Sequence, residues 1–223
     1  MAKVKLTLGF FVKAFIILLL VACSTPGMKS LKRYEDFFPK LEDNPKQWDA
    51  PMPSYSLCII SDILRLVNDK PLYTLNTTQE EHYRVVYCDY SNCAVCIHIL
   101  RSNHTVRIQC DGWPVHHGAY GFPRKSATAE LKVGDIETLA SKLEVSKFWQ
   151  ERWFPMCRPQ YFHGGFWFIE AVKNGKYHMQ IIETPTDKIL EFCLGACHLA
   201  RSKCSDVRGL INVIPQMRES KDQ

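Results

Sequence analysis

The chain lacks the short motifs that identify several common enzyme classes. It contains no G-x-S-x-G, H-E-x-x-H or phosphate-loop motif, so no signature of a hydrolase, zinc protease or nucleotide-binding protein is present. It also has no visible internal repeat. A content of 46% hydrophobic and 23% charged residues excludes a disordered or collagen-like chain, and 223 residues fit one domain or two small ones. The sequence predicts a folded protein and indicates no enzyme activity.

An excess of one charge is also missing once the N-terminus is set aside. Three of the 28 lysines and arginines lie in residues 1–22, which contain no acid. The remainder has 25 basic and 23 acidic residues, a net charge of +2 with the two signs interspersed. Nucleic-acid-binding domains concentrate positive charge on one surface. We therefore expect no nucleic-acid partner.

The one pronounced apolar run lies close to the N-terminus. Lys3, Lys5 and Lys13 precede or border an uninterrupted run of 10 residues from Ala14 to Cys23. A membrane-spanning helix needs about 20 apolar residues. A basic stretch followed by a short apolar stretch is instead typical of a secretory signal. Residues 1–22 are therefore predicted to be a signal peptide.

The end of this run, Leu20-Val21-Ala22-Cys23, resembles the bacterial lipobox. The resemblance implies that the Cys23 thiol is lipidated, that the chain is cut before Cys23, and that the new amino group is acylated, for example with palmitate. Several acyl chains together anchor a protein stably. Ser24, in place of an aspartate, implies the outer membrane, with the domain facing the periplasm. The alternatives are an ordinary cleaved signal and a eukaryotic secreted protein, since residues 76–78 and 103–105 are formal glycosylation sequons.

The other nine cysteines fit an exported protein. Disulfides persist in oxidising compartments, and an odd number leaves at least one thiol without a partner in the chain. We expect a mixture of disulfides and buried thiols. Two sharper hypotheses are a redox pair at Cys93 and Cys96 and a zinc site made of Cys88, Cys93, Cys96 and Cys110. Cys193 and Cys197, four apart on a predicted helix, are expected to share its buried face.

Periodicity predicts both helices and strands. Helices are expected over 54–67, from Asp135 and from Thr184, and strands over 83–88, 94–100, 105–110, 126–133, 166–172 and 177–183. Asn174-Gly175 predicts a tight hairpin, and residues 111–125 a long loop. The order indicates an α+β domain in which an antiparallel sheet of about five or six strands packs against two or three helices. We place a tether at 23–53, the domain at 54–205 and a polar tail at 206–223.

The second half resembles a family of uncharacterised exported bacterial proteins. The residues that carry the resemblance are Phe148-Trp149, Gly164-Gly165-Phe166-Trp167, Glu170, Asn174-Gly175-Lys176-Tyr177-His178, Pro185 and Phe192-Cys193. His163-Gly164-Gly165 lacks the aspartate that the family places before the second glycine. The resemblance covers about residues 83–201 and implies the hairpin and its flanking helices, but no activity.

Three residues are candidates for a functional surface or polar pair. Glu170 and His178 flank the predicted hairpin, and we expect them to meet across it as a pair that sets the strand register. The alternative is a carboxylate–imidazole pair that does acid–base work. Trp153 lies in the aromatic segment 148–154, a candidate contact surface together with the loop 111–125. His116-His117 is interpreted as a solvated pair rather than a metal site.

These observations predict a membrane-anchored envelope lipoprotein whose domain binds another protein, for example an immunity protein that acts against a toxin. No cofactor is expected. The alternative is a periplasmic metal-binding or hydrolytic enzyme that uses cysteine and histidine side chains.

Overall fold

A computed structural model describes most of the predicted domain. The described residues are 37–39, 54–75, 77–89, 93–103, 105–116, 119–120, 124–150, 165–182 and 187–214. The elements in chain order are α3 (Ser54–Leu66), η4 (Leu72–Thr74), β1 (Glu81–Cys88), β2 (Cys93–Arg101), β3 (Val106–His116), β4 (Ala119–Tyr120), β5 (Lys125–Glu130), α4 (Val133–Val145), β6 (Phe166–Lys173), β7 (Lys176–Ile182), α5 (Asp187–Lys203), η5 (Ser205–Val207) and α6 (Arg208–Ile211).

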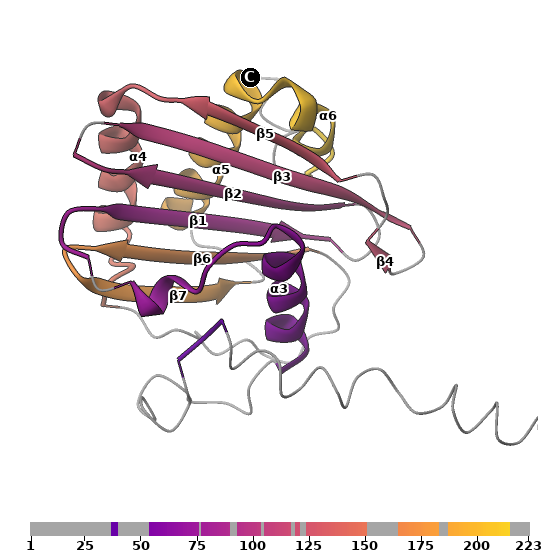
Figure 1. Cartoon of the computed structure of the whole chain (residues 1–223), viewed down its shortest axis with the longest axis horizontal. Coiled ribbons are helices and arrows are strands. Elements are labelled where there is room, and N and C mark those ends of the chain that lie inside the picture. The colour runs from indigo at the N-terminus through magenta and orange to yellow at the C-terminus, as the bar shows by residue number, and fades with distance from the viewer. Residues whose placement is uncertain are drawn as a thin grey trace, which may run out of the picture.

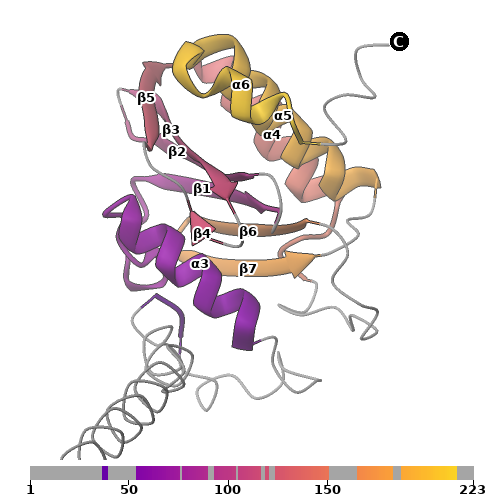
Figure 2. The ribbon, with the colours of Figure 1, turned by 90° about the vertical axis from the view of Figure 1, so that its right-hand side faces the viewer.

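The predicted α+β fold is confirmed. Six strands form an antiparallel sheet in the order β5-β3-β2-β1-β6-β7, and the two-residue strand β4 pairs with the end of β3. Helices α4, α5 and α6 cover one face of the sheet, which we call the back face, and α3 lies on the opposite, front face (Figures 1 and 2). None of the described helices is both long and apolar enough to cross a membrane.

The hairpin between β6 and β7 forms at the predicted residues. Asn174 and Gly175 have φ angles of 52° and 70°, which asparagine and glycine adopt more readily than other residues. The turn pairs Lys173 with Lys176, and from there the register runs without interruption to Trp167 and Ile182. Because side chains alternate along a strand, this register decides which face each residue of the hairpin occupies.

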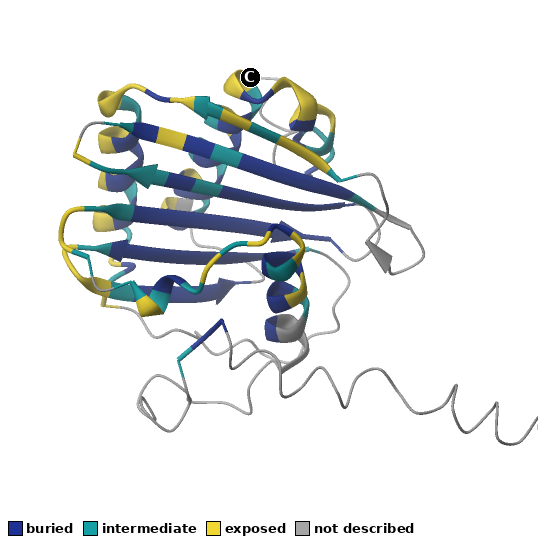
Figure 3. Cartoon of the chain, in the orientation of Figure 1, coloured by how far each residue is buried: buried dark blue, intermediate teal, exposed yellow. Residues whose placement is uncertain are grey.

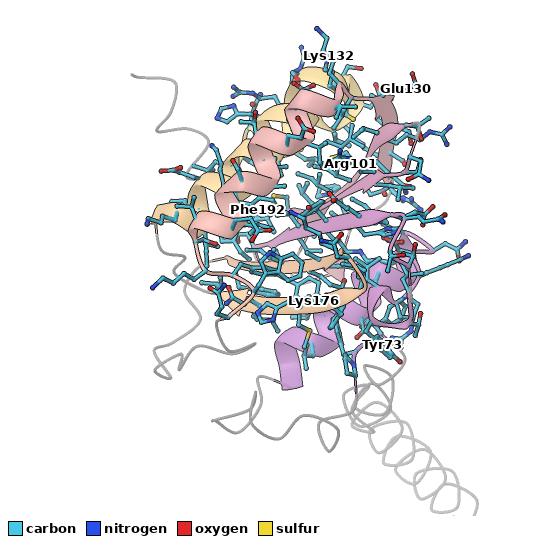
Figure 4. The ribbon with its side chains drawn as sticks, turned by 90° about the vertical axis from the view of Figure 1, so that its left-hand side faces the viewer. Tyr73, Arg101, Glu130, Lys132, Lys176 and Phe192 are labelled. Atoms are coloured by element: carbon cyan, nitrogen blue, oxygen red, sulfur yellow. The ribbon has the colours of Figure 1, made fainter. Side chains whose placement is uncertain are left out.

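The back face carries the larger apolar core. Strand residues such as Tyr83, Ile97 and Ile108 pack against the buried sides of α4 and α5. Phe192 of α5 lies between that helix and the sheet, with its ring centre 6.3 Å from that of Tyr83 (Figure 4). Burying one such side chain contributes roughly 1.5–3 kcal/mol. This layer of side chains therefore supplies most of the apolar stabilisation of the domain.

The front face is only half covered by apolar packing. Leu57, Ile60, Ile63 and Leu64 of α3 pack on Phe168 and other residues at one half of the sheet. Phe37 and Phe38, in the segment expected to tether the domain, are buried in the same cluster. Figure 3 shows that the other half, on β3 and β5, has exposed positions.

The strand predicted over 126–133 ends at Glu130, and the next helix already begins at Val133. Two other boundaries differ more. Residues 111–116, expected in a long loop, continue β3, because Asp111 to Pro114 pair with β2 despite Gly112. The polar tail was expected from residue 206, but η5, α6 and the turn after α6 bury Val207, Ile211 and Ile214 against the back core. The domain therefore extends to Ile214, because three apolar residues of this otherwise polar segment are buried.

Candidate functional site

The structure does not bring Glu170 and His178 together. In the hairpin register Glu170 lies opposite Met179, and His178 lies opposite Ala171. Directly paired residues share a face, so the offset of one residue places Glu170 on the front face and His178 on the back face. The expected polar pair across the hairpin is therefore wrong.

His178 is instead part of the back core. Its ring meets that of Phe148 edge to face at a centroid distance of 4.6 Å, and Trp149 lies 6.3 Å away. Burial lowers the pKa of His178 to about 4, so the ring is neutral at physiological pH. This residue acts as a packed aromatic ring rather than as a base.

Several predicted features lie outside the described residues. These are Trp153, the lipobox at 20–23 with Cys23, the signal peptide, most of the tether at 23–53, and His117. Their roles stay predictions.

The two sharper cysteine hypotheses are both contradicted by the alternation of side chains along β2. Cys93 points to the back core and Cys96 to the front cluster, because they are three positions apart on one strand and side chains alternate between the faces. They cannot form a redox pair. Cys88 shares the front cluster with Cys96, whereas Cys110 is in the back core with Cys93. The sheet thus separates the four thiols that were proposed to bind zinc.

The described cysteines are buried thiols. No disulfide joins any of the seven described in the structure, which are Cys88, Cys93, Cys96, Cys110, Cys193, Cys197 and Cys204. Cys193 and Cys197 lie on the buried face of α5, as predicted. Burial raises the pKa of Cys197 to about 12 and that of Cys96 further. A thiol attacks as its thiolate, so these cysteines are poor nucleophiles.

The strongest polar constellation is a network on the front face. Cross-strand pairing places Glu170 of β6, Arg84 of β1 and His98 of β2 side by side in one row. The Arg84 guanidinium donates hydrogen bonds to the Glu170 carboxylate and, at 2.7 Å, to the backbone carbonyl of Lys70. Arg84 and Glu170 are fully buried. The row therefore carries a buried ion pair across the middle of the sheet.

Asp69 connects this ion pair to the histidines. One carboxylate oxygen of Asp69 lies 3.0 Å from the Arg84 guanidinium and 3.2 Å from His98 Nδ1. The end of α3 positions it. Asn68 has a φ of 56°, and the amides of Asn68 and Asp69 bond back to the carbonyls of Arg65 and Leu64. This Schellman-type cap directs the chain across the front face.

Charge balance explains the stability of the network. Burial alone would lower the pKa of Arg84, but the charges of Glu170 and Asp69 hold it above its ordinary value. Burial would likewise raise the pKa of Asp69, but the hydrogen bond with His98 and the charge of Arg84 lower it. Burial raises the pKa of Glu170 against the opposing effects of Arg84 and of a hydrogen bond with Tyr177. Arginine stays charged in proteins, so its burial requires these carboxylates.

The network continues to the surface through a second histidine. His82 Nδ1 lies 3.2 Å from His98 Nε2, and His82 Nε2 lies 3.3 Å from a carboxylate oxygen of Glu80. Burial lowers the pKa of His82, as does the charge of His98, while Glu80 opposes the shift. The chain of contacts runs from buried Glu170 to Glu80, whose side chain is 42% exposed.

The same row ends on an open half of the front face. We use this name for Arg107 and Gln109 of β3 together with Ser126, Thr128 and Glu130 of β5. Arg107 lies opposite Glu130, and Gln109 opposite Thr128. All are exposed except the half-buried Gln109. Arg124 borders this surface and ties it to α3, because it binds Asp111 at 2.6 and 2.8 Å and the Leu66 carbonyl at 2.8 Å.

The described residues contain no group of three or more histidine, cysteine, aspartate or glutamate side chains arranged to hold a metal ion. The network ties the end of α3 to β1, β2 and β6 and can thereby fix the geometry of the sheet. Sequence reasoning missed Arg84, Asp69, His82 and His98. One signal was present: charged residues and histidines interrupt apolar, β-branched strands at 82, 84 and 98, where solvent exposure alone would not place them.

Comparisons with known proteins give no functional information, so the functional conclusion depends on the residues described above. No protein-family model, no curated protein and no solved structure matches the chain. Membership of the family of uncharacterised exported proteins, whose resemblance implied a hairpin with flanking helices, stays a prediction.

Proposed function

We propose that this chain is a lipid-anchored envelope protein of the outer membrane. Its domain faces the periplasm and binds another protein through the open half of the front face. Acyl chains on Cys23 hold it to the membrane. One version of such a role is an immunity protein that binds a toxin in the periplasm.

The observation that carries the proposal is an exposed sheet surface on a rigid support. Arg107 and Glu130 place opposite charges at paired positions, and Thr128, opposite Gln109, adds a hydrogen-bonding group beside them. Behind them lies the back core, and beside them Arg124 joins the strands to α3. A surface of this kind binds without first losing much conformational entropy, which favours recognition of a folded partner.

The cysteine part of the alternative function loses support. Nucleophilic or redox chemistry needs accessible thiolates. The described thiols are buried, and those whose pKa is shifted are shifted upward. A binding role therefore fits the described residues better than cysteine-based catalysis.

The membrane part is tested by metabolic labelling with a fatty acid. The native chain should incorporate the label and Cys23→Ala should not. Ser24→Ala serves as a matched control that should keep the label. Equal labelling of the native chain and Cys23→Ala would contradict lipidation at this residue.

The binding part is tested by site-specific photocrosslinking in cells. A photoreactive side chain at Thr128 should give one discrete crosslinked partner, whereas the same side chain at Glu137, on the outer side of α4, should not. The double variant Arg107→Glu and Glu130→Arg keeps an opposite-charge pair but reverses it, and should weaken the crosslink. Equal products at Thr128 and Glu137, or none at Thr128, would contradict the proposal.

A further inference from the structure

The segment that joins α3 to β1 crosses the front face as a strap. We use this name for residues 69–75 and 77–80, which run across the sheet from the end of α3 to the start of β1 (Figure 1). The middle of the strap is fastened to the hairpin, since the Thr77 carbonyl accepts a hydrogen bond of 3.1 Å from the Gly175 amide. Its two ends carry Asp69 and Glu80, which contact the rings of His98 and His82. The histidine pair therefore joins both ends of the strap to β1 and β2.

The contacts of the two rings require more hydrogens than two neutral imidazoles carry. His98 Nδ1 lies 3.2 Å from Asp69, and His82 Nε2 lies 3.3 Å from Glu80. The two remaining nitrogens, one from each ring, bond to each other at 3.2 Å. An ionised carboxylate only accepts, so both outer nitrogens carry a hydrogen, and the inner bond needs a third. Two neutral imidazoles have two N–H groups in total, so all three bonds form only when the pair carries one additional proton.

A further proton breaks this arrangement. With both rings fully protonated, two N–H groups would face each other at the inner contact, and two positive charges would lie side by side. Burial lowers the pKa of His82, as do the charges of His98 and Arg84, while Glu80 opposes the shift. The charged and titratable groups around the pair are Asp69, Lys70 and Glu80 of the strap, Arg84 of β1, Cys96 of β2, Arg107 of β3, Glu170 of β6 and Tyr177 of β7.

We propose that His82 and His98 act as a pH-sensitive latch, which holds the strap most tightly when the two rings share one additional proton and loosens it when both rings are fully protonated. Each ring is bonded at both nitrogens, so a ring that rotates away from the other also leaves its carboxylate on the strap. A folded-state pKa of His82 below the ordinary 6.5 means that the stabilisation is lost as pH falls below 6.5. The latch needs neither the lipid anchor nor a bound partner.

Imidazole ¹⁵N spectra of the purified full chain between pH 8 and 4.5 test the shared proton. The native pair should titrate in two steps more than about one pH unit apart, and both rings should respond in each step. His98→Gln and His82→Gln should each leave a single step at the remaining ring. Glu80→Gln keeps a hydrogen-bond acceptor but removes the charge, and should move the second step to lower pH. The ring of His198, on α5, is the control and should titrate alike in all variants. The proposal is overturned if His98→Gln leaves the titration of His82 unchanged.

Amide hydrogen exchange, corrected for the intrinsic effect of pH, tests the strap itself. The Gly175 amide, which bonds to the strap, should lose protection between pH 6.5 and 4.5, by about tenfold for each pH unit by which the second step is lowered. The Leu131 amide, which bonds to Val106 within the sheet, reports unfolding of the whole domain. His98→Gln, shown to be folded by its thermal unfolding at pH 8, should not show the loss at Gly175. Parallel changes at Gly175 and Leu131 in the native chain, or the same loss in His98→Gln, would overturn the latch.

Discussion

The two faces of the sheet are buried by different kinds of side chain. The back face is covered by α4, α5 and α6, and its strands contribute almost only apolar side chains and cysteines. The front face combines the apolar cluster under α3 with a row of charged and polar residues that runs from buried Glu170 to exposed Thr128. The back face therefore holds the domain together by packing, whereas the front face depends on exact polar pairing.

The largest expected effect is the loss of the buried ion pair. Arg84→Met leaves Glu170 buried without its counter-charge and should lower the free energy of unfolding by roughly 3–5 kcal/mol. Urea unfolding followed by circular dichroism measures the change. The double variant Arg84→Met and Glu170→Leu removes both charges and should regain a large part of this loss. A single variant as stable as the native chain would show that the front face does not depend on the pair.

On the back face, the burial of His178 can be tested by the pH dependence of the free energy of unfolding. Its folded pKa of about 4 lies below the ordinary value of 6.5, so below pH 6.5 the unfolded chain binds the proton first. The stabilisation from the neutral ring is complete above pH 6.5 and should be lost as pH falls toward 4. The total is about 3 kcal/mol at 1.36 kcal/mol per pKa unit.

Urea unfolding at pH 7, 5.5 and 4 checks this, with His178→Leu as the comparison. The stability difference between the native chain and His178→Leu should shift in favour of the variant as pH falls. His198→Leu, which changes an exposed histidine, should follow the native chain closely. A native chain and His178→Leu with the same pH dependence would contradict burial of a neutral ring.

A smaller effect is expected at the turn that assigns hairpin residues to the two faces. Gly175 has a φ of 70°, which costs a residue with a Cβ atom about 1–2 kcal/mol. Gly175→Ala should lower stability by about 1 kcal/mol. Gly134→Ala is a matched control of opposite sign, because nothing lies within 4 Å of the added Cβ and alanine favours the helix. Thermal unfolding midpoints of both variants measure these changes. A change of the same sign in the two variants would contradict the prediction.

The smallest effect is expected on the open half of the front face. Thr128→Lys should change stability by less than about 0.5 kcal/mol, because the side chain is exposed. Ala129→Lys, one residue further on β5, points to the back core and should be clearly more destabilising. Denaturation midpoints of the two variants test whether the faces are as different as the structure indicates. Equal midpoints would mean that β5 has no preferred face.

The sequence was sufficient for the strands and helices wherever one physical signal was strong. Alternating residues predicted the third strand from 105 to 110, and Asn174-Gly175 predicted a turn that needs positive φ angles. It was insufficient where signals conflicted. Gly112 and Pro114 indicated a loop, but pairing with β2 keeps this segment in the sheet. The candidate site was missed because its members come from the end of α3 and from three strands, whose register no local pattern reveals.

The sequence by itself determined the fold class, the hairpin and the apolar sides of α4 and α5, since each follows from the spacing of residues close together in the chain. Only the tertiary structure decided that Glu170 pairs with Arg84 and not with His178, and that Cys93 and Cys96 are separated by the sheet. The physical reason is the period of two along a strand. A shift of one residue in pairing exchanges the faces of every side chain, and that shift is set by contacts between distant segments.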